Sequence, residues 1–290
     1  MALGEENLVE YIKHCYLQRK ALERSLHEKA MLLFKQYMLV SGMPKPVISF
    51  IENSKDFTVA DKEKRDILKL YRNDIMKINS NYREKVISIF DQLPKILSKY
   101  EKRVVFNKIE QNSYALQYEE TFFWLADSMV CNECFMCSDP NVGAINKMRT
   151  YIKCYMGDTG LLVSLAFSDT ELMEHEVYKQ ILLGKLNMNK GMLYENVIAQ
   201  MLKSNGHKLY FYKSYNKEKH RNDIEIDNSK LNYRISPIEV KSGKRYTIKS
   251  MEKFIEKYRQ RIYTAYIIHP KNLSFEDNIL YIPPYMTMFI

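Results

Sequence analysis

The sequence predicts a multidomain α+β protein with an N-terminal helical bundle, a winged-helix domain and a C-terminal α/β sandwich. Three observations lead to this prediction. No strand pattern appears before about Val104. The middle of the chain has helical stretches followed by two strand-like runs. In the last third, helices alternate with short apolar strands, which is typical of an α/β sandwich. We therefore expect domains at residues 1–71, 72–166 and 167–290.

The first domain is expected to be helical throughout. Apolar residues recur at spacings of three and four in Ala30, Leu33, Phe34, Tyr37 and Met38. This period indicates an amphipathic helix. Gly42-Met-Pro44 ends that helix, and a second helix begins near Pro46. Asp56 is expected to cap a third helix through Val59–Tyr71, because its carboxylate can accept hydrogen bonds from free backbone amides.

The second domain has the element order of a winged helix. Helices are expected at about Val86–Tyr100 and Tyr118–Asp127, with a short strand at Arg103–Phe106 between them. Two β-like runs follow, Met129–Cys137 and Tyr151–Met156, and they would form the wing. An ordinary α+β connector has the same order of elements, and this alternative stays open.

The third domain is expected to combine three helices with five strands. The helices lie at about Thr170–Leu183, Gly191–Lys203 and Ile248–Arg259. The strands lie at about Lys208–Tyr212, Ile224–Asp227, Arg234–Lys241, Thr264–Ile268 and Ile279–Ile282. This order predicts helices packed around a small mixed sheet.

Positive charge is concentrated in the C-terminal third. The chain has a formal net charge of +9. From Lys190 to the end there are 18 Lys and Arg against 10 Asp and Glu, a balance of +8, whereas the preceding part has 26 against 25. A polyanion such as DNA is therefore an expected partner of the C-terminal part. The alternative is a lysine-rich surface that serves solubility alone.

Several function classes are excluded by what the sequence lacks. The five cysteines, an odd number, and the absence of a secretory segment indicate the cytoplasm. No apolar run approaches the roughly 20 residues that a membrane span needs. Strand alternation places Cys131 and Cys137 on one face and Cys134 on the other, so the three cannot all bind a zinc ion without a turn, and we expect small buried hydrophobes instead. No G-x-x-x-x-G-K-[ST] motif occurs, so we expect no ATP site in this chain.

The candidate catalytic residues lie on two neighbouring strands. Glu239 and Lys241 end an apolar strand and lie on the same face of it, and Asp227 ends the strand before. Two carboxylates can hold Mg²⁺ or Mn²⁺, and an ammonium can stabilise the phosphate under attack. Phosphodiester cleavage needs this set of groups. Whether Asp227 joins the other two depends on how the strands pair.

A third acid, Glu195, is the remaining candidate metal ligand. It belongs to a helical stripe with Met192, Ala199 and Leu202. A carboxylate in such a stripe needs a cation or a hydrogen-bond donor, which Lys241 or a metal ion shared with Asp227 would supply. The alternative is a structural ion pair between Glu195 and Lys241.

Cations flank this candidate site on both sides in the sequence. Lys244, Arg245 and Lys249 follow the Glu239 strand and lead into the next helix. Three more cations precede the Asp227 strand, at Lys217, Lys219 and Arg221. We expect these six residues to contact DNA phosphates, although a solvated basic face is the alternative.

Five stretches of the sequence carry a family resemblance. They are Phe34–Pro44, Leu70–Ile75, Cys154–Leu162, Tyr194–Asn196 and Pro237–Ser242. In this order they resemble signature stretches of prokaryotic AAA-type P-loop ATPases. Those proteins carry a C-terminal domain of unknown function with a restriction-endonuclease-like, PD-(D/E)xK fold. The sequence departs from the family pattern in having Asn228-Ser-Lys230 directly after Asp227.

The resemblance implies a lid, a winged helix and a nuclease-like domain without the ATPase core. It identifies Glu195, Asp227, Glu239 and Lys241 as the nuclease-like site. The implied partners are DNA and either a separate ATPase subunit or a second copy of the chain. Two functions are expected from these observations. One is a DNA-associated nuclease, and the other is a non-catalytic accessory module or the remnant of a truncated ATPase.

Overall fold

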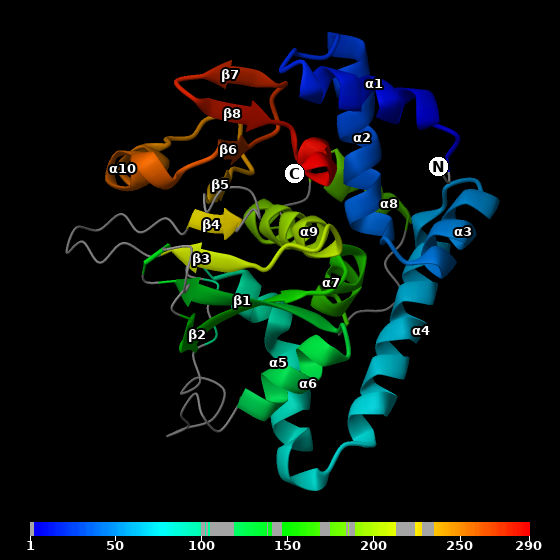
Figure 1. Cartoon of the computed structure of the whole chain (residues 1–290). Coiled ribbons are helices and arrows are strands. Elements are labelled where there is room, and N and C mark those ends of the chain that lie inside the picture. The colour runs from blue at the N-terminus through cyan, green and yellow to red at the C-terminus, as the bar shows by residue number, and fades with distance from the viewer. Residues whose placement is uncertain are drawn as a thin grey trace. The chain divides into compact units, whose positions relative to one another are not determined.

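The structure has a mixed α+β fold, which confirms the broad class expected from the sequence (Figure 1). It is a computed structural model that describes residues 3–99, 102, 104, 119–137, 139–140, 147–168, 175–183, 185, 189–212, 224–227 and 235–290. Its α-helices are α1 (Glu6–Leu17), α2 (Arg24–Val40), α3 (Pro44–Glu52), α4 (Phe57–Met76), α5 (Ser80–Leu97), α6 (Glu119–Asp127), α7 (Thr159–Ala166), α8 (His175–Leu182), α9 (Lys190–Ser204) and α10 (Lys249–Tyr258).

Its strands and short helices complete the fold. The strands are β1 (Cys131–Cys137), β2 (Lys147–Met156), β3 (Tyr210–Tyr212), β4 (Ile224–Asp227), β5 (Ser236–Val240), β6 (Ala265–Ile268), β7 (Ser274–Glu276) and β8 (Ile279–Ile282). Two 3₁₀ helices, η3 (Arg259–Arg261) and η4 (Pro284–Phe289), follow α10 and β8.

The chain divides into two compact units that do not follow its linear order. The first unit comprises residues 1–4, 33–133 and 153–200. The second comprises residues 5–32, 134–152 and 201–290. The N-terminal helix α1 therefore belongs to the same unit as the C-terminal strands. The domain boundaries expected at 71/72 and 166/167 stay predictions.

The first unit is built around helices α4, α5 and α7. Asp56 caps α4 as expected, since its side chain accepts a hydrogen bond of 2.9 Å from the backbone amide of Thr58. Helix α7 is buried along almost its whole length, from Thr159 to Leu165. Asp158 begins α7 by accepting from the Leu161 amide at 2.9 Å and also accepts from the Gly42 amide at 2.8 Å. The turn before α3 is thereby fixed to the start of α7.

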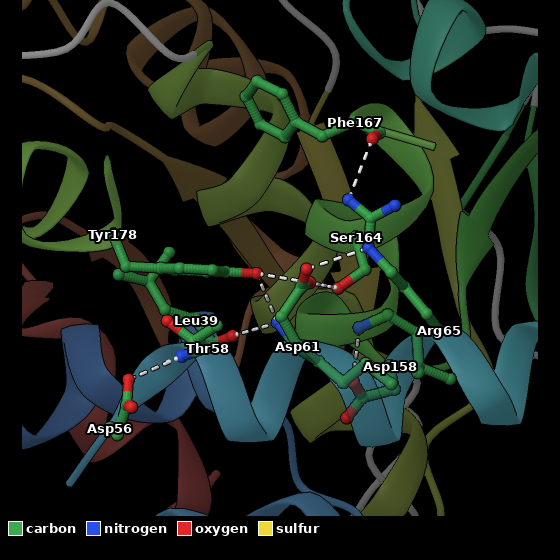
Figure 2. A network of polar contacts seen from close by, with 11 residues as sticks. Leu39, Asp56, Thr58, Asp61, Arg65, Asp158, Ser164, Phe167 and Tyr178 are labelled. Atoms are coloured by element: carbon green, nitrogen blue, oxygen red, sulfur yellow. Dashed lines mark hydrogen bonds and ion pairs between the residues drawn. The ribbon is translucent and has the colours of Figure 1, made fainter. Parts of the chain in front are cut away.

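A buried polar network centred on Asp61 joins α4 to α7 and α8 (Figure 2). One carboxylate oxygen of Asp61 accepts hydrogen bonds from Ser164 at 2.6 Å and from Tyr178 at 2.7 Å, and the other accepts from Arg65 at 2.8 Å. The buried ammonium of Lys64 donates to Tyr178 at 2.9 Å and to the Leu39 carbonyl at 2.7 Å. Since buried charges are costly unless they are paired, this network fixes how the three helices pack.

The second unit contains most of an eight-stranded mixed sheet in the order β2-β1-β3-β4-β5-β6-β8-β7. Strands β5, β6 and β8 run parallel to one another, whereas β4 pairs antiparallel with both β3 and β5. Strand β1 joins this sheet by pairing parallel with β3, Phe135 lying opposite Tyr210. The strands expected to form the wing thus extend the sheet of the C-terminal part.

One face of the sheet packs against α10. Met251, Phe254 and Tyr258 on the helix lie in one buried cluster with Ile267 on β6. At the edge of the sheet, β7 and β8 are joined by Asp277 and Asn278, whose φ angles are 50° and 62°. Two consecutive positive φ angles match a type I′ hairpin turn, for which Asp and Asn are suited.

The N-terminal segment packs on the C-terminal strands within the second unit. The side chain of Asn272 holds both backbone groups of Leu22: it accepts from the amide at 3.1 Å and donates to the carbonyl at 2.7 Å. The ring of Tyr16 lies 5.5 Å from that of Phe289, between centroids. His27 and Tyr285 are joined by a hydrogen bond of 2.9 Å between Nδ1 and the hydroxyl.

Most of the expected elements are present in the described residues. Helix α7 and strand β7 were not expected, and the strand expected at Arg103–Phe106 lies outside the described residues apart from Val104. Within the part of the chain that the structure describes, none of the helices has the length and apolar composition that crossing a bilayer requires.

Candidate functional site

The best-placed part of the expected site is the pair Glu239 and Lys241. Glu239 lies on β5 in register with Ile267 of β6, and Lys241 directly follows the strand. Because side chains alternate along a strand, both residues lie on the same sheet face as Ile267, the face that α10 covers. The backbone amide of Lys241 donates to the Ile268 carbonyl at 2.8 Å. The sheet therefore fixes the backbone positions of both residues.

The two side chains form a nearly buried ion pair. The ammonium of Lys241 lies 2.7 Å from Oε1 of Glu239. The side chain of Glu239 is only 3% exposed and that of Lys241 is 14% exposed. A carboxylate this deeply buried needs a cation or several donors to stay ionised, and Lys241 supplies the cation. Part of the expected catalytic set is thus brought together.

Two neighbours of this pair, His269 and Tyr246, were not among the catalytic residues expected from the sequence. His269 follows β6 as Lys241 follows β5, so both lie at the carboxyl ends of adjacent parallel strands. The hydroxyl of Tyr246 lies 2.6 Å from Nδ1 of His269, within hydrogen-bonding distance. The signal in the sequence was the polar residue directly after each apolar parallel strand, where ligands gather in open α/β sheets.

Burial controls the protonation of these two neighbours. Burial, helped by the nearby Lys271 cation, lowers the pKa of His269 to about 4, so this ring is neutral at physiological pH. Burial also raises the pKa of Tyr246 to about 12, and the acidic neighbours Tyr281, Glu276 and Glu239 add to that shift. The carboxyl end of β6 therefore presents neutral hydrogen-bonding groups next to the Glu239–Lys241 ion pair.

Asp227 lies further along the sheet than the expected site requires. In the antiparallel register of β4 and β5, Asp227 lies opposite Ser236, three residues before Glu239. Three residues correspond to about 10 Å along a strand. Ser236 and Glu239 also lie on opposite faces of β5, because their separation is odd. The structure does not describe the side chain of Asp227.

Glu195 lies on α9 in the first unit, and its partner is Lys102. The Lys102 ammonium donates a hydrogen bond to Oε1 of Glu195. Their side chains are 10% exposed for Lys102 and 24% exposed for Glu195. Glu195 therefore forms an ion pair with Lys102, and Lys241 forms one with Glu239. These two pairs replace the one expected between Glu195 and Lys241.

The metal site stays a prediction. Among the residues that the structure describes, no group of three His, Cys, Asp or Glu side chains is arranged to hold a metal ion. The carboxylate of Glu239 already binds the ammonium of Lys241. Among the described residues, Glu239 and Lys241 thus form a buried ion pair with each other.

The expected DNA-binding residues divide into two groups. Lys244, Arg245 and Lys249 are exposed and lie between β5 and the first turn of α10. Lys217, Lys219 and Arg221 lie outside the described residues. From 241 to 261 the sequence has eight Lys and Arg against two Glu, so the described group belongs to a strongly basic segment.

Two further lysines in this segment were not singled out from the sequence. Lys253 and Lys257 are exposed on α10 and follow Lys249 at intervals of four residues. That spacing, which places side chains on neighbouring turns of one helix side, was the available signal.

Comparison with known proteins gives two partial family matches. Residues 31–172 match a family model described as a domain of unknown function (DUF8612). Residues 190–286 match another, also described as a domain of unknown function (DUF4143). No curated protein and no solved structure matches the chain. The C-terminal part of this chain is thus similar to DUF4143, a domain found in the C-terminal region of AAA-type ATPase-like proteins.

Proposed function

We propose that this protein binds DNA as the non-ATPase part of an AAA-type ATPase-like system, through a C-terminal domain with a restriction-endonuclease-like fold. The observation that carries the proposal is the exposed group Lys244, Arg245 and Lys249 directly after the Glu239–Lys241 strand. The net positive charge of the C-terminal third supports it. The match of residues 190–286 to a domain of AAA-type ATPase-like proteins supports the association with an ATPase.

The winged helix is the second part of the proposal. Helices α5 and α6 followed by β1 and β2 have the order of a winged-helix domain, with β1 also pairing with β3 of the C-terminal sheet. Its second helix begins with Glu119 and Glu120, whose negative charges are unfavourable next to DNA phosphates. We therefore assign a protein-binding role to this segment, with an ATPase subunit or a second copy as the partner.

Binding is tested with a fluorescently labelled DNA duplex at low salt. Wild type should raise the anisotropy of the label, and Lys244→Ala/Arg245→Ala should bind more weakly with any duplex sequence, because phosphate contacts carry no sequence information. The matched control is Lys13→Ala/Lys20→Ala, which removes two exposed lysines elsewhere in the second unit. If wild type leaves the anisotropy unchanged at low salt, the DNA-binding proposal is wrong.

Metal-dependent DNA cleavage is the second candidate function. The position of Glu239 and Lys241 at the carboxyl end of β5 favours it, with Asp227 and Glu195 as the further metal ligands expected from the resemblance. The test compares wild type, Glu239→Ala and Lys241→Ala on linear and supercoiled DNA with Mg²⁺ or Mn²⁺. Cleavage by wild type alone would support this function, whereas equal cleavage by all three, or by none, would rule out catalysis at this site.

A further inference from the structure

One side of α10 carries a regular row of lysines. Lys249, Lys253 and Lys257, here called the lysine stripe, recur every four residues and are all exposed. Four residues of α-helix advance about 6 Å along the axis, so the ammonium groups follow one another on successive turns. Only Lys249 among them belongs to the DNA-binding residues expected from the sequence.

The packing of α10 fixes which way the stripe faces. Met251, Phe254 and Tyr258 are buried against the sheet, and they face away from Lys249 and Lys253, whereas Lys257 lies at the edge of the buried side. The ring of Tyr212 on β3 meets that of Phe254 edge-on, with 5.1 Å between centroids. Because this aromatic contact fixes the rotation of α10 about its axis, the stripe must face outward.

The last lysine of the stripe is held in place. The ammonium of Lys257 donates to the Tyr212 hydroxyl at 3.0 Å and lies 4.9 Å from the centre of the Tyr258 ring. Hydrogen bonds with Tyr258 and Tyr212 raise the pKa of Lys257 above its usual value, so it stays charged at physiological pH. A cation that is already ordered loses less side-chain entropy when it meets an anion.

The acidic residues of α10 form a row directly beside the lysine stripe, since Glu252 and Glu256 each follow a stripe lysine by three residues. Glu252 and Glu256 line a pocket of about 660 Å³ together with Arg259, beside the first residues of β6 and β8. The pocket side thus carries acids and arginines together, whereas the stripe itself carries cations only.

We propose that the lysine stripe binds the phosphate backbone of double-stranded DNA. This inference rests on the proposed DNA binding and extends its surface from the loop before α10 to the end of the helix. Single-stranded nucleic acid is bound through stacking on exposed aromatic rings. Phe254 and Tyr258, the aromatic residues of α10, are instead buried. The stripe offers ammonium groups only, which favours contact with backbone phosphates and predicts binding without sequence preference.

The test measures how the affinity of wild type and variants for a labelled duplex depends on salt. Each phosphate contact contributes about 0.9 to the slope of log affinity against log salt. Lys253→Gln/Lys257→Gln should therefore reduce the slope by about 2, whereas Lys13→Gln/Lys20→Gln should leave it unchanged. Lys253→Gln alone leaves the Lys257–Tyr212 contact intact and should reduce the slope by about 1. This second variant keeps the test decisive if the double variant does not fold.

Each other outcome overturns a defined part of the proposal. If wild type binds DNA and the stripe variants keep the wild-type slope, the stripe is not the contact surface, although DNA binding itself stands. If wild type binds no DNA, the proposed function fails and the inference fails with it. Binding of a single strand as tightly as the duplex, with the same loss in the variants, would contradict the assignment to duplex DNA. Equally tight, stripe-dependent binding of polyglutamate would indicate an acidic protein partner instead.

Discussion

The ammonium of Lys241 lies 2.7 Å from Oε1 of Glu239, two residues earlier in the chain, and both side chains are nearly buried. This relationship links the candidate site to the stability of the sheet. A buried carboxylate that loses its cation is more costly than a partly accessible ammonium that loses its carboxylate. The two residues should therefore respond differently to substitution.

Lys241→Met is expected to lower the free energy of unfolding by about 3 kcal/mol, because it leaves Glu239 buried without that cation. Glu239→Gln should cost less, since Lys241 retains some access to solvent. The double variant Glu239→Gln/Lys241→Met should lose less than the sum of the single losses. Urea denaturation measures all three, and strictly additive losses would show that the pair does not interact.

His269 should make the protein sensitive to mild acid. Its pKa is about 4 in the folded chain against an ordinary value of 6.5, so the unfolded chain binds more protons between these two pH values. The free energy of unfolding should therefore fall as the pH decreases from 6.5 to 4. Urea midpoints across this range measure the effect. His269→Gln should show a smaller fall than wild type, and an equal fall in both would mean that other groups cause it.

Gly160 should not tolerate a side chain, although it lies in a helix. A Cβ atom there would lie 2.6 Å from both the backbone nitrogen and Cα of Ser41. Gly160→Ala is thus expected to destabilise the protein by about 2 kcal/mol, whereas alanine normally stabilises a helix interior by about 1 kcal/mol relative to glycine. At the control position Gly243, the nearest atom would lie 3.6 Å away. A thermal melt in which Gly160→Ala is stabilised would contradict the close contact.

The network around Asp61 predicts that replacing one carboxylate by an amide strongly lowers the free energy of unfolding (Figure 2). Burial alone would raise the pKa of Asp61, but hydrogen bonds from Ser164 and Tyr178 and the nearby cations outweigh it, and its pKa is lowered. Asp61→Asn removes the charge that balances Lys64 and Arg65, and it should cost about 3 kcal/mol of unfolding free energy. Asp66→Asn, at an exposed ion pair with Lys69, is the matched control and should change little. Equal losses in the two variants would argue against the network.

The sequence predicted those elements whose pattern is local. The cap at Asp56, the helix expected at about Ile248–Arg259 and the strand that carries Glu239 all follow from neighbouring residues. Helix α7 was not predicted because it is buried on all sides. Its apolar residues therefore show no helical period. Strand β7 has three residues, too few for alternation to be visible.

Contacts between distant parts of the chain were not predictable in this way. The place of residues 5–32 in the unit of the C-terminal strands depends on pairs such as Leu22 and Asn272, which are 250 residues apart. The partner of Glu195 is Lys102, 93 residues earlier, and no spacing rule connects them. Likewise, the cross-strand pairing of Asp227 with Ser236 depends on strand register, which the sequence of either strand alone does not determine.

The most direct test of the central claim is the salt dependence of duplex binding by the wild-type protein. The exposed cations Lys244, Arg245, Lys249, Lys253 and Lys257 predict a straight line of log affinity against log salt with a slope of about −4 to −5. A slope of this size would show that these cations replace counterions along the DNA. No binding at low salt, or binding whose affinity does not change with salt, would contradict the account.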